Sequence, residues 1–232
     1  MNEALSHDLM KIYEKITINE DSSCPTEELV IGMVGTICSG VSTTVNIMKH
    51  ILEDDYGYTV NVIKVSDIIN EHIENNPSQI GKDRIKALQN KGDNLRYNFG
   101  NDYLAAEAIK AINNIAKRDN ISNLSVNIKP SRQATIIDSL KHPDESKLLR
   151  YVYGEAYIQF TVFAPEDIRK IRFDKKFNFD KESCYPDIFA RDEADNKPNG
   201  QKVADTTHRS DFFIRNDKQE YTRLISVIHR FI

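Results

Sequence analysis

The residues with the clearest chemical pattern lie between positions 35 and 43. Gly35 and Gly40 are five residues apart, and the hydroxyl residues Ser42 and Thr43 follow after Val41. Glycines at this spacing let the backbone curl so that successive N–H groups converge on phosphate oxygens. The helix expected after the loop would present the partial positive charge of its N-terminus to the same anion. The predicted phosphate-binding residues are Gly35, Thr36, Ser39, Gly40, Val41, Ser42 and Thr43.

One position of this loop departs from the usual G-x-x-x-x-G-K-[ST] pattern, because Val41 stands where lysine is common. That lysine places a mobile charge between the outer phosphates, which matters most while phosphoryl transfer shifts charge. Backbone amides and the helix dipole bind an anion without it. We therefore expect nucleotide binding, and leave phosphoryl transfer open. The alternative is a plain strand–turn–helix connection with capping serines.

Asp138 ends a buried apolar segment, "ATIIDSL", that we expect to be a strand. Open α/β sheets bind their ligands at the carboxyl ends of the strands. A carboxylate there would hold Mg²⁺ together with the hydroxyl of Ser42, and we assign both residues to a metal site that accompanies the nucleotide. The alternative is a helix N-cap at Asp138. Lys141 and His142 follow on a loop that would face the same cleft.

Three groups of basic and amide side chains are further candidates. Gln89 and Arg96 lie on a segment with helical spacing, where a guanidinium suits phosphate and an amide suits a base edge. Arg169 and Arg172 are three residues apart on one expected helix, and with Asp138 they are the candidate catalytic residues. Arg191 lies in an expected lid. For every group, a solvated helix face or ordinary surface ion pairing is the alternative.

Strands and helices must alternate along the chain to bring these residues together. Apolar runs predict strands over residues 29–34, 59–65, 134–140, 157–165 and 211–217. Helical spacing predicts helices over residues 42–54, 102–117, 144–154, 166–173 and 219–232, with a surface loop over 118–133. This alternation indicates an α/β fold with a parallel five-stranded sheet flanked by helices. We expect a short helix and linker over 1–27, one domain over 28–232, and a lid over about 175–209.

Composition narrows the class of protein. The chain has 232 residues, a formal net charge of −4 and three cysteines without paired spacing. The charge argues against a general electrostatic footprint for nucleic acid. The cysteine spacing suggests neither zinc nor a disulfide framework. Apolar runs are too short to cross a bilayer, and the first residues are too polar for a signal peptide, so we expect a cytoplasmic protein without a membrane partner.

Four segments carry a resemblance to a known family. They are "LVIGMVGTICSG", "LQNKGDNLRYNFGNDYLAAEAI", "ATIIDSLKHPDESKLLRYVYG" and "RDEADNKPNGQKVADTTHRSDFFIRND". In this order they resemble the N-terminal P-loop kinase-like region of the anti-phage deoxycytidylate and dCTP deaminases. The resemblance spans roughly residues 28–232. More distantly, the layout is similar to that of deoxynucleoside monophosphate kinases.

The resemblance implies a P-loop NTPase fold of the nucleoside monophosphate kinase type, followed in the family by a zinc deaminase domain that depletes dCTP or dCMP. The zinc signature, H-x-E with a later P-C-x-x-C, is absent from this sequence. The resemblance therefore implies a regulatory or nucleotide-sensing part, with Mg²⁺ and ATP, a dNTP or a dNMP as ligands. It also places Arg96 near a bound monophosphate or base.

Partners and activity stay open at this point. The apolar closing helix would pack against a deaminase domain or against a second copy of the chain. An active deoxynucleoside monophosphate kinase, with Lys141 or a lid arginine supplying the missing charge, is the alternative function. A third hypothesis is an oligomerising module that binds no small molecule.

Overall fold

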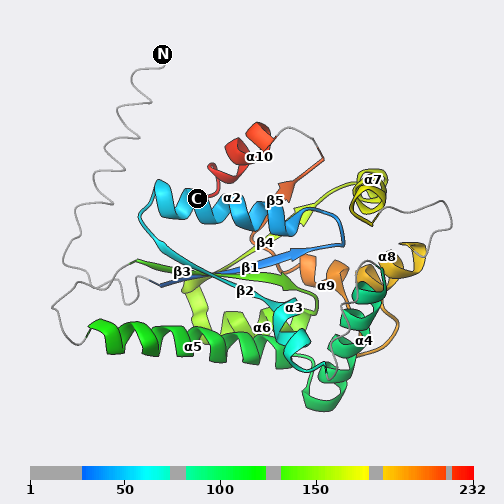
Figure 1. Ribbon diagram of the computed structural model, residues 1–232, viewed down its shortest axis with the longest axis horizontal. Coiled ribbons are helices and arrows are strands. Elements are labelled where there is room, and N and C mark those ends of the chain that lie inside the picture. The colour runs from blue at the N-terminus through cyan, green and yellow to red at the C-terminus, as the bar shows by residue number, and fades with distance from the viewer. Residues whose placement is uncertain (1–27, 74–81, 124–131, 178–184, 218–220) are drawn as a thin grey trace.

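The computed structural model describes residues 28–73, 82–123, 132–177, 185–217 and 221–232, which contain one five-stranded parallel sheet (Figure 1). The sheet order is β2-β3-β1-β4-β5. The strands are β1 (Glu28–Gly35), β2 (Thr59–Lys64), β3 (Gln133–Leu140), β4 (Tyr157–Phe163) and β5 (Phe212–Arg215). The predicted α/β fold with a parallel five-stranded sheet is confirmed. The helix and linker expected over residues 1–27 lie outside the described residues.

Helices cover both faces of this sheet. Their bounds are α2 (Val41–Asp54), α3 (Val65–Glu71), α4 (Lys82–Phe99), α5 (Tyr103–Asn123), α6 (Pro143–Tyr153), α7 (Glu166–Phe177), α8 (Tyr185–Ala194), α9 (Val203–Thr207) and α10 (Tyr221–Ile228), with a 3₁₀ turn at Gly154–Ala156. In Figure 1, α2 and α10 lie on one side of the sheet and α5 and α6 on the other. None of the described helices is long and apolar enough to cross a bilayer.

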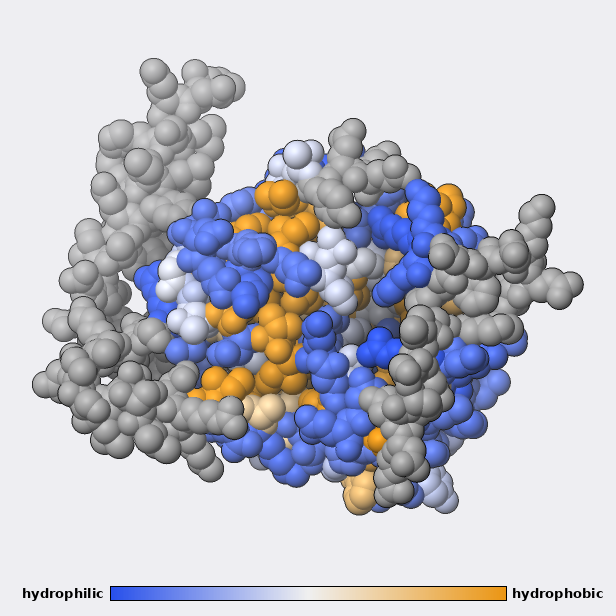
Figure 2. Space-filling view, viewed as in Figure 1, coloured by the Kyte–Doolittle hydropathy of each residue, from blue (hydrophilic) through white to orange (hydrophobic). Residues whose placement is uncertain are grey.

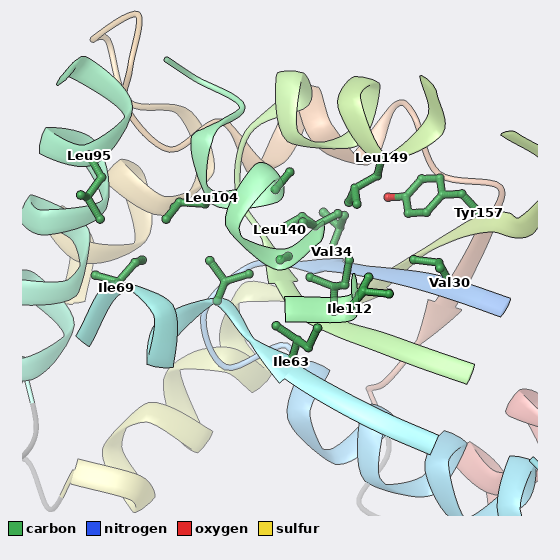
Figure 3. Packing of buried hydrophobic residues seen from close by; sticks show 14 of the residues in the cluster. Val30, Val34, Ile63, Ile69, Leu95, Leu104, Ile112, Leu140, Leu149 and Tyr157 are labelled. Atoms are coloured by element: carbon green, nitrogen blue, oxygen red, sulfur yellow. The ribbon is translucent and has the colours of Figure 1, made fainter. Parts of the chain in front are cut away.

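The central strand β1 shows why its sequence is an unbroken apolar run. Val30 and Val34 pack into the cluster beneath α3, α5 and α6 (Figure 3), whereas Ile31 and Met33 pack against α2 and α10. Successive side chains of a strand point to opposite faces, so a strand covered on both faces must be apolar at every position. Gly32 lies between them because a Cβ there would come within 2.2 Å of the Tyr157 hydroxyl.

Several elements differ from the sequence expectations. Helix α3 follows β2 without a loop, in a segment where no helix was predicted and the expected strand ends at residue 65. Its Val65 and Ile69 are buried under α4 and α5. The helix has seven residues, too few for a helical spacing of apolar residues to be recognised in the sequence, and its packing against α4 and α5 stabilises it. Helix α5 continues to Asn123, into the expected loop. The described part of the expected lid contains α8 and α9, whose Ile188, Phe189 and Val203 are buried.

Candidate functional site

The glycine-containing loop connects β1 to α2 at the carboxyl edge of the sheet. Gly40 is the N-cap of α2 with φ of 95°, and Cys38 also has a left-handed φ of 62°. The Ser39 amide donates to the Thr36 carbonyl at 3.0 Å, which closes a turn. The first amides of an α-helix have no acceptor within the helix, so those at the start of α2 are available to an anion. This arrangement matches the loop geometry that the glycine spacing predicts, and phosphate binding by it stays a prediction.

Both glycines are required by close contacts. A Cβ on Gly35 would lie 2.5 Å from a Val41 methyl and 2.8 Å from the Val162 carbonyl. A Cβ on Gly40 would lie 2.1 Å from the Asn216 amide nitrogen, and its φ already disfavours side chains. Glycine is therefore needed at these two positions because a side chain would collide with its neighbours, and at Gly40 also because of its positive φ.

Two side chains from distant elements bind the loop at the Ser39 carbonyl. Arg172 of α7 donates to the Ser39 carbonyl at 3.1 Å and to the Asn216 carbonyl at 3.0 Å. The Asn216 side chain, just after β5, donates to the same Ser39 carbonyl at 2.9 Å. These bonds satisfy the Ser39 carbonyl and fix the loop to α7 and to the end of β5.

Ser42 and Asp138 meet at the start of α2. The Ser42 hydroxyl donates to the Asp138 carboxylate at 2.9 Å. Burial raises the pKa of Asp138 above its ordinary value, although the bond from Ser42 and the charge of Lys141 act against the shift. One carboxylate beside a hydroxyl fits Mg²⁺ that arrives with a nucleotide, because such sites use one or two carboxylates plus substrate phosphates. Among the described residues, no group of three or more His, Cys, Asp or Glu side chains forms a separate metal cage.

Lys141 reaches the loop from the segment after β3. Its Nζ donates to the Gly35 carbonyl and to the Asp192 carboxylate, both at 2.8 Å. The other Asp192 oxygen accepts from the Ile37 amide at 2.7 Å. Asp192 is fully buried and belongs to α8, so helix α8 is joined to the loop through one carboxylate.

These residues line a pocket of about 650 Å³ between the loop, α4 and α7. Its charged lining consists of four basic residues, Arg84, Lys141, Arg172 and Lys176, and one acidic residue, Asp138. Ile85 and Leu88 of α4 add an apolar wall. Figure 2 shows hydrophilic residues over much of the described surface at the end of the molecule where α4, α7 and α8 lie. A positive pocket in a chain of net charge −4 favours an anionic ligand.

Most of the predicted site residues line this pocket. They are Gly35, Thr36, Gly40, Val41, Ser42, Thr43, Asp138 and Arg172. Ser39 is fully buried, and its carbonyl accepts the hydrogen bonds from Arg172 and Asn216. The side chain of Val41 does not extend over the loop, since Val41 is 8% exposed and belongs to the core beneath α2.

Three other predicted residues are not part of the pocket wall. Arg96 is buried and donates from Nε and Nη2 to one Glu145 oxygen at 2.9 and 2.7 Å. Gln89 is buried and donates to the Ile188 carbonyl and to Gln201. The Arg169 guanidinium lies 4.8 Å from the centre of the Phe189 ring. Their assignment to nucleotide binding and catalysis stays a prediction.

Arg191 of the expected lid binds α4, through Asn90 and Asp93. This contact joins α8 to α4. Because Asp192 is the next residue, α8 contacts α4 and the phosphate-binding loop through consecutive side chains.

Sequence reasoning missed Asp192 and Asn216 as loop-binding residues. A signal existed for Asn216, which directly follows the last strand and therefore lies at the carboxyl edge of the sheet. Asp192 offered none, because its partner Ile37 is 155 residues away in the sequence.

The strand order together with a glycine loop between β1 and α2 is the architecture of the P-loop NTPases. The chain has a P-loop kinase-like fold. No protein-family model and no curated protein sequence matches the chain.

Solved structures align over most of the chain at low similarity. Shikimate kinase from Acinetobacter baumannii in complex with shikimate is 9% identical over 88% of this chain and 92% of that chain, with a TM-score of 0.47. TT1252 from Thermus thermophilus is 17% identical over 89% and 96%, with a TM-score of 0.43. Chaetomium thermophilum Kti12 in complex with ADP-AlF3 is 13% identical over 87% and 96%, also at 0.43. At this similarity, the function must be argued from the chain's own geometry.

Proposed function

We propose that this chain binds a nucleoside triphosphate together with Mg²⁺ in the P-loop pocket. The observation that carries the proposal is the bond between Ser42 and Asp138 at the N-terminus of α2. It joins the hydroxyl and the carboxylate that would share the ion, directly beside the loop amides that would bind the phosphates. Arg172 and Asn216 both bind the Ser39 carbonyl, so the loop is held in place without a lysine at position 41.

The biological role that fits best is nucleotide sensing. The sequence segments quoted above resemble the regulatory region of the anti-phage deoxycytidine nucleotide deaminases, and the loop supports binding better than transfer. We propose that occupancy of the pocket regulates a deaminase domain or a partner copy. The apolar wall formed by Ile85 and Leu88 leaves space for a nucleobase beside the phosphates.

Isothermal titration calorimetry with ATP, GTP and the four dNTPs, with and without Mg²⁺, tests the binding proposal. We expect binding at micromolar concentration that Mg²⁺ strengthens, with a deoxycytidine nucleotide preferred if the sensing role is right. Asp138→Asn keeps an acceptor for the Ser42 hydroxyl but removes the charge, so we expect it to abolish most of the strengthening by Mg²⁺. Absence of binding at millimolar nucleotide would refute the proposal.

Phosphoryl transfer to a nucleoside monophosphate is the second candidate. The pocket favours it in one respect, because it extends beyond the loop to Arg84 of α4 and so has room for a second anionic ligand. This function predicts ADP release from ATP and a dNMP, followed by a coupled assay. Turnover should disappear in Asp138→Ala and persist in Lys110→Met, which removes an exposed charge on α5. A wild-type protein that binds both ligands without releasing ADP would leave sensing as the function.

A further inference from the structure

We propose that Lys141 is the phosphate-binding cation of this site and replaces the lysine that Val41 displaces from the loop. The inference rests on the proposed nucleotide binding and deepens it, since it names the side chain that binds the outer phosphates. It also accounts for a P-loop that has valine at position 41 and yet keeps its other features.

The position of the ammonium group carries the argument. Lys141 Nζ lies 2.8 Å from the carbonyl oxygen of Gly35, the first residue of the loop, so the charge lies directly at the loop. An ammonium group has three N–H donors. Gly35 and Asp192 accept two of them. Lys141 is one of the residues that line the pocket, and we assign its remaining donor to a phosphate oxygen.

The sheet explains how a residue more than a hundred positions away reaches the loop. Strand β3 pairs with β1 in parallel, with Asp138 opposite Met33 and Leu140 opposite Val34. Lys141 therefore leaves the sheet beside the first residues of the loop, three positions after the carboxylate proposed for Mg²⁺. One strand end thus supplies both the metal ligand and the cation, while Val41 is free to fill the core beneath α2.

Asp192 is the positioning residue for this cation. It is fully buried, and its two oxygens accept from Lys141 Nζ and from the Ile37 amide. A buried carboxylate that is hydrogen-bonded on both oxygens holds the Lys141 side chain in one rotamer. Ligand binding then costs less side-chain entropy, because the lysine is already ordered. The carboxylate also balances the lysine charge, which a bound phosphate would share.

The experiment compares Lys141→Met, Lys141→Arg and the charge-matched control Lys110→Met. Each protein is titrated with ATP and with dCTP, and with the di- and monophosphates of both, at a temperature well below its Tm. A lost charge-assisted hydrogen bond predicts a decrease of about 10- to 100-fold in triphosphate affinity for Lys141→Met. The decrease should be smaller for the diphosphate and smallest for the monophosphate. Lys141→Arg should recover part of the affinity, and Lys110→Met should bind as the wild type does.

Two outcomes would overturn the assignment of Lys141 alone, and a third would overturn the proposed nucleotide binding as well. Wild-type binding that Lys141→Met leaves unchanged shows that the loop amides suffice. An equal loss for mono-, di- and triphosphate, with a lower Tm and no recovery in Lys141→Arg, shows that the lysine only joins α8 to the loop. If the wild type binds none of these ligands, the proposed function itself fails, and the assignment fails with it.

Discussion

Two clusters of charged residues meet at the segment 141–145, and they differ in how their central carboxylates, Glu145 and Asp138, are hydrogen-bonded. In the closed cluster, Glu145 is fully buried and accepts four hydrogen bonds, two from Arg96 and two from the backbone amides of Lys141 and His142. In the open cluster around the P-loop, Asp138 has one hydroxyl partner and a raised pKa, and four cations line a pocket.

The difference separates a carboxylate whose hydrogen bonds are all internal from a carboxylate that lines a pocket. Buried charges persist in folded proteins when hydrogen bonds and a counter-charge satisfy them, as around Glu145. A half-satisfied carboxylate beside several cations costs stability unless something binds there, and such imbalance is typical of functional sites. The two clusters share Lys141, whose amide belongs to the closed cluster and whose ammonium group belongs to the open one.

The largest expected effect comes from breaking the closed cluster. Arg96→Met leaves Glu145 charged and buried, and removal of one partner of a buried pair costs about 3–5 kcal/mol of unfolding free energy. Lys147→Met, which breaks the exposed pair with Asp144, should cost about 0–1 kcal/mol. Urea unfolding measures both.

The same variant tests the sequence-based assignment of Arg96 to nucleotide binding. We expect folded Arg96→Met to keep most of its triphosphate affinity, because the pocket wall does not include Arg96. A large loss of affinity at a temperature where the variant is fully folded would show that this arginine reaches the ligand.

A glycine pair sharpens the comparison at the loop. Gly40→Ala and Gly57→Ala both place a side chain at positive φ, which costs about 1–2 kcal/mol of unfolding free energy. A Cβ at position 57 meets nothing within 4 Å, whereas one at position 40 collides with Asn216. We expect both variants to lose stability but only Gly40→Ala to lose most of its triphosphate affinity by calorimetry. Equal affinities in the two variants would contradict a pre-shaped loop.

The pH dependence of ligand binding tests the open cluster. Mg²⁺ binds the ionised form of Asp138, and burial raises the pKa of this carboxyl. The Mg²⁺-dependent part of nucleotide affinity should therefore decrease as pH falls through that raised pKa, by up to about tenfold per pH unit. Asp138→Asn should show little Mg²⁺ dependence at any pH. A wild-type Mg²⁺ effect that stays constant down to pH near the ordinary aspartate value would contradict the metal assignment.

The smallest effect is the pH dependence of stability in the closed cluster. Burial lowers the pKa of His142, whose Nδ1 accepts from the Asp144 amide at the start of α6. The folded protein therefore binds fewer protons than the unfolded chain. His142 therefore contributes to the free energy of unfolding above the pKa of about 6.5 that it has in the unfolded chain. This contribution is lost as pH falls toward the lowered pKa of the folded state, by at most about 1.4 kcal/mol per pH unit. His142→Asn keeps a capping side chain without titration, and its urea midpoint should decrease less between pH 7 and 5.

The sequence alone determined the parts of the molecule that depend on local geometry. The apolar run before Gly35 predicts a strand buried on both faces, and the spacing of Gly35, Gly40 and Ser42 predicts the loop after it. Asp138 was predicted at the sheet edge because it ends an apolar segment. These features are set by side-chain periodicity and by backbone conformations that only certain residues adopt.

Only the tertiary structure decided which polar side chains face the loop. Gln89 and Arg96 lie on helix α4 as expected, but the packing of α4 against α6 and α8 directs them into buried hydrogen bonds. Lys141 and Asp192 bind loop residues that are 106 and 155 positions away in the sequence. No local pattern encodes such contacts, because they arise only when strand order and helix packing bring separate segments to one edge of the sheet.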